Sequence, residues 1–376
     1  MGDEDLEGLI RYYFVRGFQY VEIIQFLSKY HGKVISQRTL HRRLREYGLN
    51  RRTPSYDIDE IEEEVRQLLD GPECLVGYRH IWHTLQRRGI QVPRFVVQEL
   101  MQYLDPEGCE LRRAHRLRRR VYHNAGPNAV WHVDGYDKLK PYGFPIHGCI
   151  DGWSRKVLWL VVTRSNNYPD NIASYYLDAV EQYGGCPVEV DTDLGTENGT
   201  MAAIQAFFRD DEHAHRFVSS PRNQRIEGYW SFYRRNNSTW WINFFQDLIC
   251  QNHLNTSDPL ETECLWFCFA GLLQNDLDKV REHWNTHRIR QSRCDTIPGR
   301  PDALFYLPEL QGGTSNLSLP VPDREITYAR DQLVENAVHE EYQQYFQYVT
   351  DTNHVRKPAH WREALQLYHY LLQIAR

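Results

Sequence analysis

Hydrophobic residues in the middle of the chain change several times from short continuous runs to helical spacing and back. Short runs rich in β-branched and aromatic residues predict buried strands, whereas apolar residues three and four apart predict helices. The predicted elements, in order, are strands near 130–137, 144–151 and 156–163, a helix at 170–183, a strand at 187–192, a helix at 200–208, a strand near Phe217 and a long helix from Pro221. This order predicts an α/β core with one mixed sheet and flanking helices.

The N-terminal region carries helical spacing and predicts small all-α units. In the first unit, a basic third helix is expected to begin after Ser36, a favourable N-cap, and to stop at Gly48. A short turn containing Gly32 precedes this helix. That is the layout of a helix-turn-helix, in which the last helix enters the major groove of DNA. A solvated charged face is the alternative interpretation.

The remaining regions give weaker signals. In a second helix-turn-helix-like unit, Gly89 separates two helices and Pro93 begins the next one. An arginine-rich stretch follows, and it predicts either a linker lying along DNA phosphates or an exposed tether. The predicted domains are the first helix-turn-helix unit at 1–52, the second at 53–104, the linker at 105–129, the core at 130–310 and a tail at 311–376 with helices at 323–337 and 359–375. The tail is expected to be a cap or an oligomer contact.

Net charge does not by itself mark this chain as a binder of nucleic acid. The formal charge at pH 7 is −6, from 44 Lys and Arg against 50 Asp and Glu. Phosphates respond to the local field rather than to the total charge. The basic residues concentrate in the third predicted helix and in the linker. The candidate DNA-binding residues are Arg38, Arg42, Arg45, Arg112, Arg118, Arg119 and Arg120.

The eight cysteines do not form a Cys-x-x-Cys pair. Cys264 and Cys268 lie one turn apart in an apolar run, which is typical of core thiols. The first 120 residues offer no combination of paired His and paired Cys for a zinc module. Because neither a signal peptide nor a membrane-spanning run is found, we expect a reducing, intracellular compartment and no membrane partner.

Three carboxylates occur in well-formed local contexts. Asp134 ends the first predicted strand, Asp193 follows the fourth, and Glu227 falls in the second turn of the helix after Pro221. Acids at the ends of neighbouring strands can converge on one point, and Glu227 can lean over them from the helix. Oxygen ligands suit Mg²⁺, and two such ions roughly 3.5 to 4 Å apart can hold the attacking and leaving oxygens of a phosphoryl transfer. The pattern therefore indicates metal-dependent chemistry on phosphodiester bonds.

Each acid also has a structural interpretation. A single Asp at a strand end is more often a turn former or a helix cap than a metal ligand. Asp191 competes with Asp193, because strand alternation directs both side chains to the same face. Asp137, Asp151 and Asp170 lie at turns or at a helix start, and we predict that they are structural.

The motifs resemble the integrase-type DDE transposases, which include retroviral and retrotransposon integrases and bacterial insertion-sequence transposases. The matching segments, in the family's order, are Trp131–Asp134, Ile150–Arg155 leading into Val157–Val162, Asp191–Gly199, Asn223–Trp230, Trp284–Arg290 and Pro298–Pro301. Between Asp193 and Glu227 lie 33 residues, close to the family's spacing. The chain is most similar to integrase-core proteins encoded in animal and fungal genomes. It departs from retroviral integrases, which carry an N-terminal zinc module.

The resemblance implies a ribonuclease-H-like core with adjacent first and fourth strands. It implies that Asp134, Asp193 and Glu227 are catalytic and hold two Mg²⁺ or Mn²⁺ ions, and it favours Asp193 over Asp191 because the family's ligand lies directly before a glycine turn. The implied activity is that of a DNA integrase or transposase, a polynucleotidyl transferase that cleaves and joins strands.

The implied partners are double-stranded element ends, target DNA and further copies of the chain, and the inferred substrate implies a nuclear location. The alternatives are a host-retained, integrase-derived factor that binds DNA or protein without catalysis, and a ribonuclease-H-type nuclease without strand transfer.

Overall fold

The computed structural model describes residues 3–51, 56–113, 124–218, 223–291, 297–311, 315–334 and 340–376. The chain divides into two compact units. One comprises Met1–His123 with His283–Ser315, and the other comprises Asn124–Glu282 with Asn316–Arg376. Within the described residues, no helix is both long enough and apolar enough to cross a membrane.

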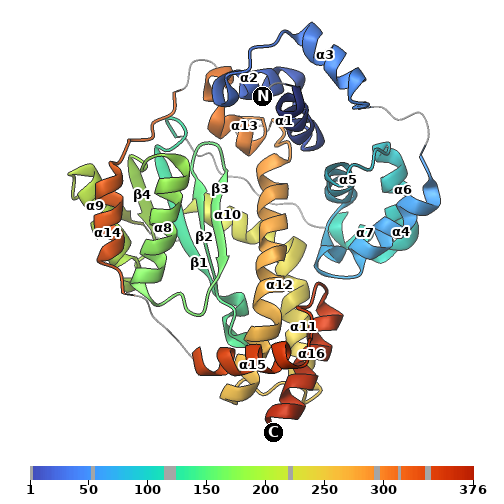
Figure 1. Ribbon diagram of the computed structural model, residues 1–376, viewed down its shortest axis with the longest axis vertical. Coiled ribbons are helices and arrows are strands. Elements are labelled where there is room, and N and C mark those ends of the chain that lie inside the picture. Colours follow the sequence, from blue (N-terminus) through green and yellow to red (C-terminus); the bar gives the residue numbers. More distant parts are fainter. Residues whose placement is uncertain are drawn as a thin grey trace. The chain divides into compact units, whose positions relative to one another are not determined.

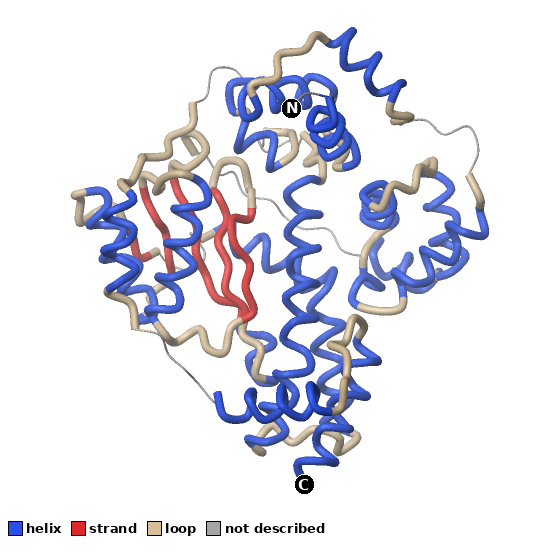
Figure 2. Tube along the Cα trace, viewed as in Figure 1, coloured by secondary structure: helices blue, strands red, loops and turns tan. Residues whose placement is uncertain are grey.

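A five-stranded mixed sheet forms the centre of the second unit (Figures 1 and 2). Its strands are β1 (Val130–Tyr136), β2 (Ile146–Asp151), β3 (Val157–Val162), β4 (Glu189–Thr192) and β5 (His215–Phe217), in the spatial order β3-β2-β1-β4-β5. Strand β1 is antiparallel to β2 and parallel to β4, and β5 is parallel to β4. The predicted mixed sheet and the adjacency of its first and fourth strands are therefore confirmed.

The two faces of β1 have different partners because side chains alternate along a strand. Trp131 is fully buried and packs edge-on against Tyr176 of α8 (Pro169–Tyr183), with ring centroids 6.0 Å apart. Helix α9 (Gly199–Arg209) packs beside α8. The other face carries His132 and Asp134 and contacts α10 (Gln224–Tyr233). The helix expected from Pro221 begins at Gln224 in the structure, and Pro221 itself lies outside the described residues.

Aromatic residues after α10 fill a core rather than a surface. A π-helical turn (Arg234–Ser238) leads into α11 (Thr239–Cys250), and α12 (Pro259–Thr286) follows. Trp241, Phe245 and Phe269 are buried and in mutual ring contact. Their burial and mutual contacts show that they form part of the core. Cys264 and Cys268 are also buried on α12, as core thiols.

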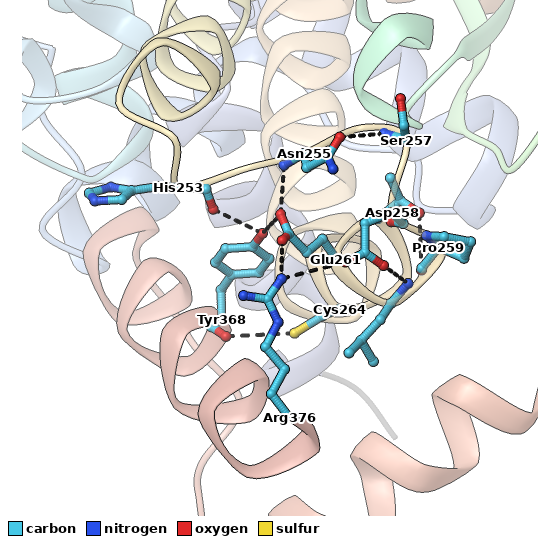
Figure 3. A network of polar contacts seen from close by, with 11 residues as sticks. His253, Asn255, Ser257, Asp258, Pro259, Glu261, Cys264, Tyr368 and Arg376 are labelled. Atoms are coloured by element: carbon cyan, nitrogen blue, oxygen red, sulfur yellow. Dashed lines mark hydrogen bonds and ion pairs between the residues drawn. The ribbon is translucent and has the colours of Figure 1, made fainter.

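The C-terminal helices pack onto the same unit. They are α14 (Asp323–Asp331), α15 (Glu340–Thr352) and α16 (Trp361–Ala375). The predicted helix at 323–337 ends at Asp331, and α15 was not predicted. Figure 3 shows how α16 is held: Tyr368 donates to the carbonyl of His253 and to Glu261, while Arg376 pairs with Glu261 and Asp258. The tail thus caps the start of α12.

The first unit contains two separate helical cores. The first core joins α1 (Asp3–Val15), α2 (Tyr20–His31) and α3 (Gln37–Glu46) to α13 (Pro301–Tyr306). The second is built by α4 (Ile58–Leu69), α5 (Tyr78–Arg87) and α6 (Arg94–Leu104), and α7 (Pro106–Arg113) follows. Short helical turns also occur at Pro72–Leu75, Asp137–Tyr142, Thr196–Asn198 and Pro308–Gln311.

The predicted boundaries of α3 are close to the observed ones. Ser36 is its N-cap, and the Ser36 hydroxyl accepts a hydrogen bond from the Thr39 amide at 3.1 Å. Gly48 follows the helix with a φ of +67°, a left-handed conformation that favours glycine.

Candidate active site

Asp134 lies near the end of the central strand, on the face covered by α10. Its side chain is partly buried, and its Oδ2 accepts a hydrogen bond of 2.9 Å from the indole nitrogen of Trp230. The pKa of Asp134 is raised to about 7, chiefly by burial and also by the negative charges of Asp193 and Glu227. Asp134 is therefore held in a negative environment that disfavours its own ionisation.

Asp193 reaches the same edge of the sheet from the neighbouring strand. The parallel register pairs Val130 with Glu189 and His132 with Asp191, and Asp193 lies two residues beyond Asp191, as Asp134 lies two residues beyond His132. Asp193 directly follows β4, and its Oδ1 accepts a hydrogen bond of 3.3 Å from Asn198. The turn after the strand thus fixes this carboxylate beside the first one.

Glu227 approaches from the helix rather than from the sheet. It lies in the first turn of α10, where negative charge interacts favourably with the helix dipole. Its charge acts on Asp134 together with that of Asp193. The structure therefore brings the three predicted acids into one electrostatic cluster.

Asp191 belongs to a different network. It is only 4% exposed, and its Oδ1 accepts a 3.0 Å hydrogen bond from Arg216 on β5. Its Oδ2 lies 3.7 Å from Nδ1 of His132. Glu189 also pairs with Arg216. Asp191 is thus neutralised inside the sheet, two residues below the edge at which Asp193 lies.

A buried polar link joins the strand of Asp134 to the helix of Glu227. The amide nitrogen of Asn223 donates to the carbonyl of Val133 at 3.1 Å, so its oxygen is left to accept from Nδ1 of His132 at 2.8 Å. Asn223 and His132 are 1% and 0% exposed. Sequence reasoning missed both roles. The signals were a polar His two residues before Asp134 in a buried strand, and an Asn at the cap of the helix.

The other acids have structural roles, as predicted. Asp151 accepts hydrogen bonds from the backbone N–H of Asn128 and from the backbone N–H and the hydroxyl of Ser154. The bonds to Ser154 shape the turn between β2 and β3. Asp170 accepts from the hydroxyl of Thr200 and the amide of Val334. Asp137 is bonded by Asn166 and Lys140.

The three acids form an all-oxygen donor set of the kind that Mg²⁺ and Mn²⁺ prefer. Within the described residues, no group of three or more His, Cys, Asp or Glu side chains is arranged to hold a metal ion. The raised pKa of Asp134, caused first by burial and then by the charges of Asp193 and Glu227, fits a cation here, because a bound divalent ion would stabilise the ionised carboxylate. In their present arrangement the carboxylates interact through their charges without a complete ligand geometry.

The predicted DNA-binding residues fall into two sets. Arg38, Arg42 and Arg45 are exposed on α3 at positions i, i+4 and i+7, which lie on one helix face. Leu40 and Leu44 bury the opposite face. Arg112 belongs to α7, with a side chain outside the described part, and Arg118, Arg119 and Arg120 lie outside the described residues.

The chain belongs to the integrase core domain family, whose model matches residues 121–311, just over half of its length. No curated protein matches it in sequence. The cryo-electron microscopy structure of the simian T-cell lymphotropic virus intasome in complex with PP2A regulatory subunit B56 gamma is similar to it at 17% identity. That match covers 70% of this chain and 77% of the other, with a TM-score of 0.33. Membership of the family places the protein in the polynucleotidyl transferase superfamily and confirms the ribonuclease-H-like fold class.

Proposed function

We propose that this protein is a DNA integrase or transposase that cleaves DNA strands and joins the freed 3′ ends to target DNA, with Mg²⁺ or Mn²⁺ as cofactor. One observation carries the proposal. Asp134, Asp193 and Glu227 come from two parallel strands and one helix, and they form a single electrostatic cluster at one edge of an integrase core. A nuclear location follows from this substrate.

The roles of the acids follow from their positions. Asp134 is the proposed central ligand, because the charges of Asp193, directly after the neighbouring strand, and of Glu227, on the helix, both act on it. Two divalent ions bound there would neutralise charge on the phosphate and orient the attacking and leaving oxygens. The protein contributes the fixed geometry: a short turn holds Asp193, and the Asn223 link anchors the helix of Glu227 to the strand of Asp134.

Double-stranded DNA is the proposed partner of the first unit. The exposed arginines of α3 follow a turn and lie on one face, which suits insertion of the helix into a major groove. Recognition of two DNA ends in one reaction requires more than one copy of such a helix. We therefore also propose a homo-oligomer on DNA.

The proposal is tested with the full chain, DNA duplexes carrying the sequences that flank the gene, and a plasmid target in Mn²⁺. Asp134→Asn, Asp193→Asn and Glu227→Gln should each abolish nicking and joining while duplex binding persists. Asp178→Asn is the matched control, because Asp178 is exposed and pairs with Arg330 away from the cluster. If the parent chain binds the duplexes but neither nicks nor joins them, the protein is a DNA-binding factor without catalysis.

A further inference from the structure

Trp230 donates a hydrogen bond directly to the central acid of the cluster. Its indole nitrogen lies 2.9 Å from Oδ2 of Asp134, and the side chain is 5% exposed. Trp230 also lies three residues after Glu227 on α10, so the two side chains share one helix face. One face of one helix thus carries the third acid and a hydrogen-bond donor to the first acid.

A glycine on the neighbouring strand provides the space for this indole. Gly148 is paired with Asp134 in the antiparallel register of β1 and β2, and directly opposed residues point to the same face of a sheet. A Cβ atom at Gly148 would lie 2.9 Å from Cη2 and 3.3 Å from Cζ2 of Trp230. The missing side chain therefore leaves room for the ring at the position from which its nitrogen reaches the Asp134 carboxylate.

The ring is also fixed from a second side. Tyr136, two residues beyond Asp134 on the same face of β1, packs against Trp230 with ring centroids 5.2 Å apart. The Tyr136 hydroxyl is in turn hydrogen-bonded to Ser238 at 2.5 Å. The indole nitrogen is therefore aimed at Asp134 by packing on both strands, and not by the hydrogen bond alone.

We propose that Trp230 is a positioning residue that sets the orientation of the Asp134 carboxylate toward a divalent cation, an inference that rests on the proposed function. Rotation of an Asp carboxylate about χ2 is broad and nearly two-fold. A donor on Oδ2 selects one orientation before any ion arrives and directs Oδ1 to a fixed place. Without the donor, cation binding has to order the carboxylate, so affinity falls.

The chain contains a matched control for this interaction. Trp241 also donates its indole N–H to a buried carboxylate, Oδ2 of Asp276, at 3.1 Å. Trp241 is 2% exposed, and Asp276 lies outside the three-acid cluster. A merely structural role of Trp230 predicts that replacing either tryptophan has the same consequences. A positioning role predicts that only the replacement of Trp230 lowers the affinity for the cation.

The test is a titration of the full chain with Mn²⁺, in which free Mn²⁺ is followed by electron paramagnetic resonance. Trp230→Phe retains the ring and removes the donor, and it should weaken Mn²⁺ binding by about tenfold, in the range found for residues that orient metal ligands. Trp241→Phe should leave the affinity unchanged while lowering the unfolding temperature comparably. Gly148→Ala, which retains the donor but displaces the ring, should also weaken binding and serves if Trp230→Phe does not fold.

The outcomes separate this inference from the proposed function. If Asp134→Asn abolishes Mn²⁺ binding but Trp230→Phe and Gly148→Ala bind like the parent, the positioning role is wrong and the proposed function stands. If the parent binds no Mn²⁺, or if Asp134→Asn binds it equally well, both are overturned. Weaker binding in Trp230→Phe, with parental affinity in Trp241→Phe, supports the positioning role.

Discussion

His132 and Asn223 are hydrogen-bonded at 2.8 Å inside the protein, and this contact connects the central strand to the helix that carries the third acid. Burial lowers the pKa of His132, so the imidazole is neutral and donates through Nδ1. The same Asn223 amide donates to the backbone at Val133, one residue before Asp134. The relative position of Asp134 and Glu227 therefore depends on a residue that is not an acid.

We expect Asn223→Ala to destabilise the protein and to reduce its activity. The change removes the hydrogen bonds of Asn223 to the buried carbonyl of Val133 and to the buried imidazole of His132, at a cost of about 1 to 3 kcal/mol in the free energy of unfolding. Urea denaturation measures that loss, and strand joining by the folded variant measures the activity. Asn353→Ala removes a comparable side-chain bond, to the carbonyl of Val349, and should leave joining intact. Parental stability and joining in Asn223→Ala would show that the link is dispensable.

Replacement by Asn should lower mainly the stability of the protein at Asp191 and mainly its strand-joining activity at Asp193. Asp191→Asn weakens the pair between the buried Asp191 and the half-exposed Arg216, so the unfolding free energy should fall by about 1 kcal/mol. Asp193→Asn removes a partly exposed charge and should abolish joining with little effect on stability. Thermal unfolding and strand joining are measured on both variants. If Asp193→Asn stays active and Asp191→Asn is folded but inactive, the metal ligand is Asp191.

The sequence predicted those elements of the fold whose local hydrophobic pattern matches the side of the element that is buried. The strands expected near 130–137 and 187–192 are observed within two residues, because short β-branched runs between turns have few other ways to be buried. Helix α12 was not predicted: its 28 residues contain a continuous apolar run, Leu265–Leu273, followed by a largely charged stretch, so no single apolar face marks the whole helix. Helix α15 was missed for a similar reason, since Gln and Tyr dominate its sequence.

The surroundings of the site were less predictable than its acids. Asp134, Asp193 and Glu227 were predicted from local patterns at strand ends and a helix start, together with the family's motif order and spacing. The contact of Trp230 with Gly148 depends on the register between β1 and β2 and on the placement of α10 over both strands. Registers of this kind come from packing of the whole unit, so a helix residue could not be matched to a strand glycine in advance.

Removal of divalent metal should make the acid cluster a source of instability. Burial and the charges of Asp193 and Glu227 disfavour the ionised form of Asp134. In EDTA at pH 8, Asp134→Asn should therefore be more stable than the parent. Its unfolding free energy should be higher by an amount on the order of 1 kcal/mol, and its unfolding temperature should rise accordingly. Addition of Mn²⁺ should stabilise the parent and not the variant. Equal Mn²⁺-induced shifts in both proteins would contradict this prediction.

Acid should destabilise the first unit through two buried histidines. Nδ1 of His83 and Nδ1 of His283 lie 3.1 Å apart, and burial lowers the pKa of both, that of His83 to about 2. The unfolded chain takes up protons below pH 6.5 that the folded chain does not, so stability is lost as the pH falls from 6.5 toward 2. Each histidine contributes up to about 1.4 kcal/mol per pH unit.

Urea denaturation midpoints measured between pH 7.5 and pH 5 test this predicted loss of stability. His83→Gln should lose less stability than the parent as the pH falls. His213→Gln is the control, because that side chain is 86% exposed. Parallel pH profiles for His83→Gln and the parent would exclude the effect.

The last prediction separates DNA recognition from chemistry. Arg42 and Arg45 are exposed on α3, and a major-groove helix should use such residues for base or phosphate contacts. Replacing both with Ala should weaken binding to element ends. Loss of a base contact costs about 1 to 3 kcal/mol and relaxes sequence preference, whereas loss of a phosphate contact weakens binding to all sequences and flattens its salt dependence. Replacing Arg118, Arg119 and Arg120 should produce the second kind of loss alone.

Titrations of the full chain with duplexes at several salt concentrations distinguish these effects. Arg66→Ala is the matched control, because Arg66 is an exposed arginine on α4 that pairs with Glu62. It should change neither affinity nor salt slope. If the double variant of Arg42 and Arg45 behaves like this control, α3 presents a solvated face. Recognition would then lie elsewhere, with Arg87, Arg88 and Arg94 of the second predicted helix-turn-helix-like unit as the next residues to replace.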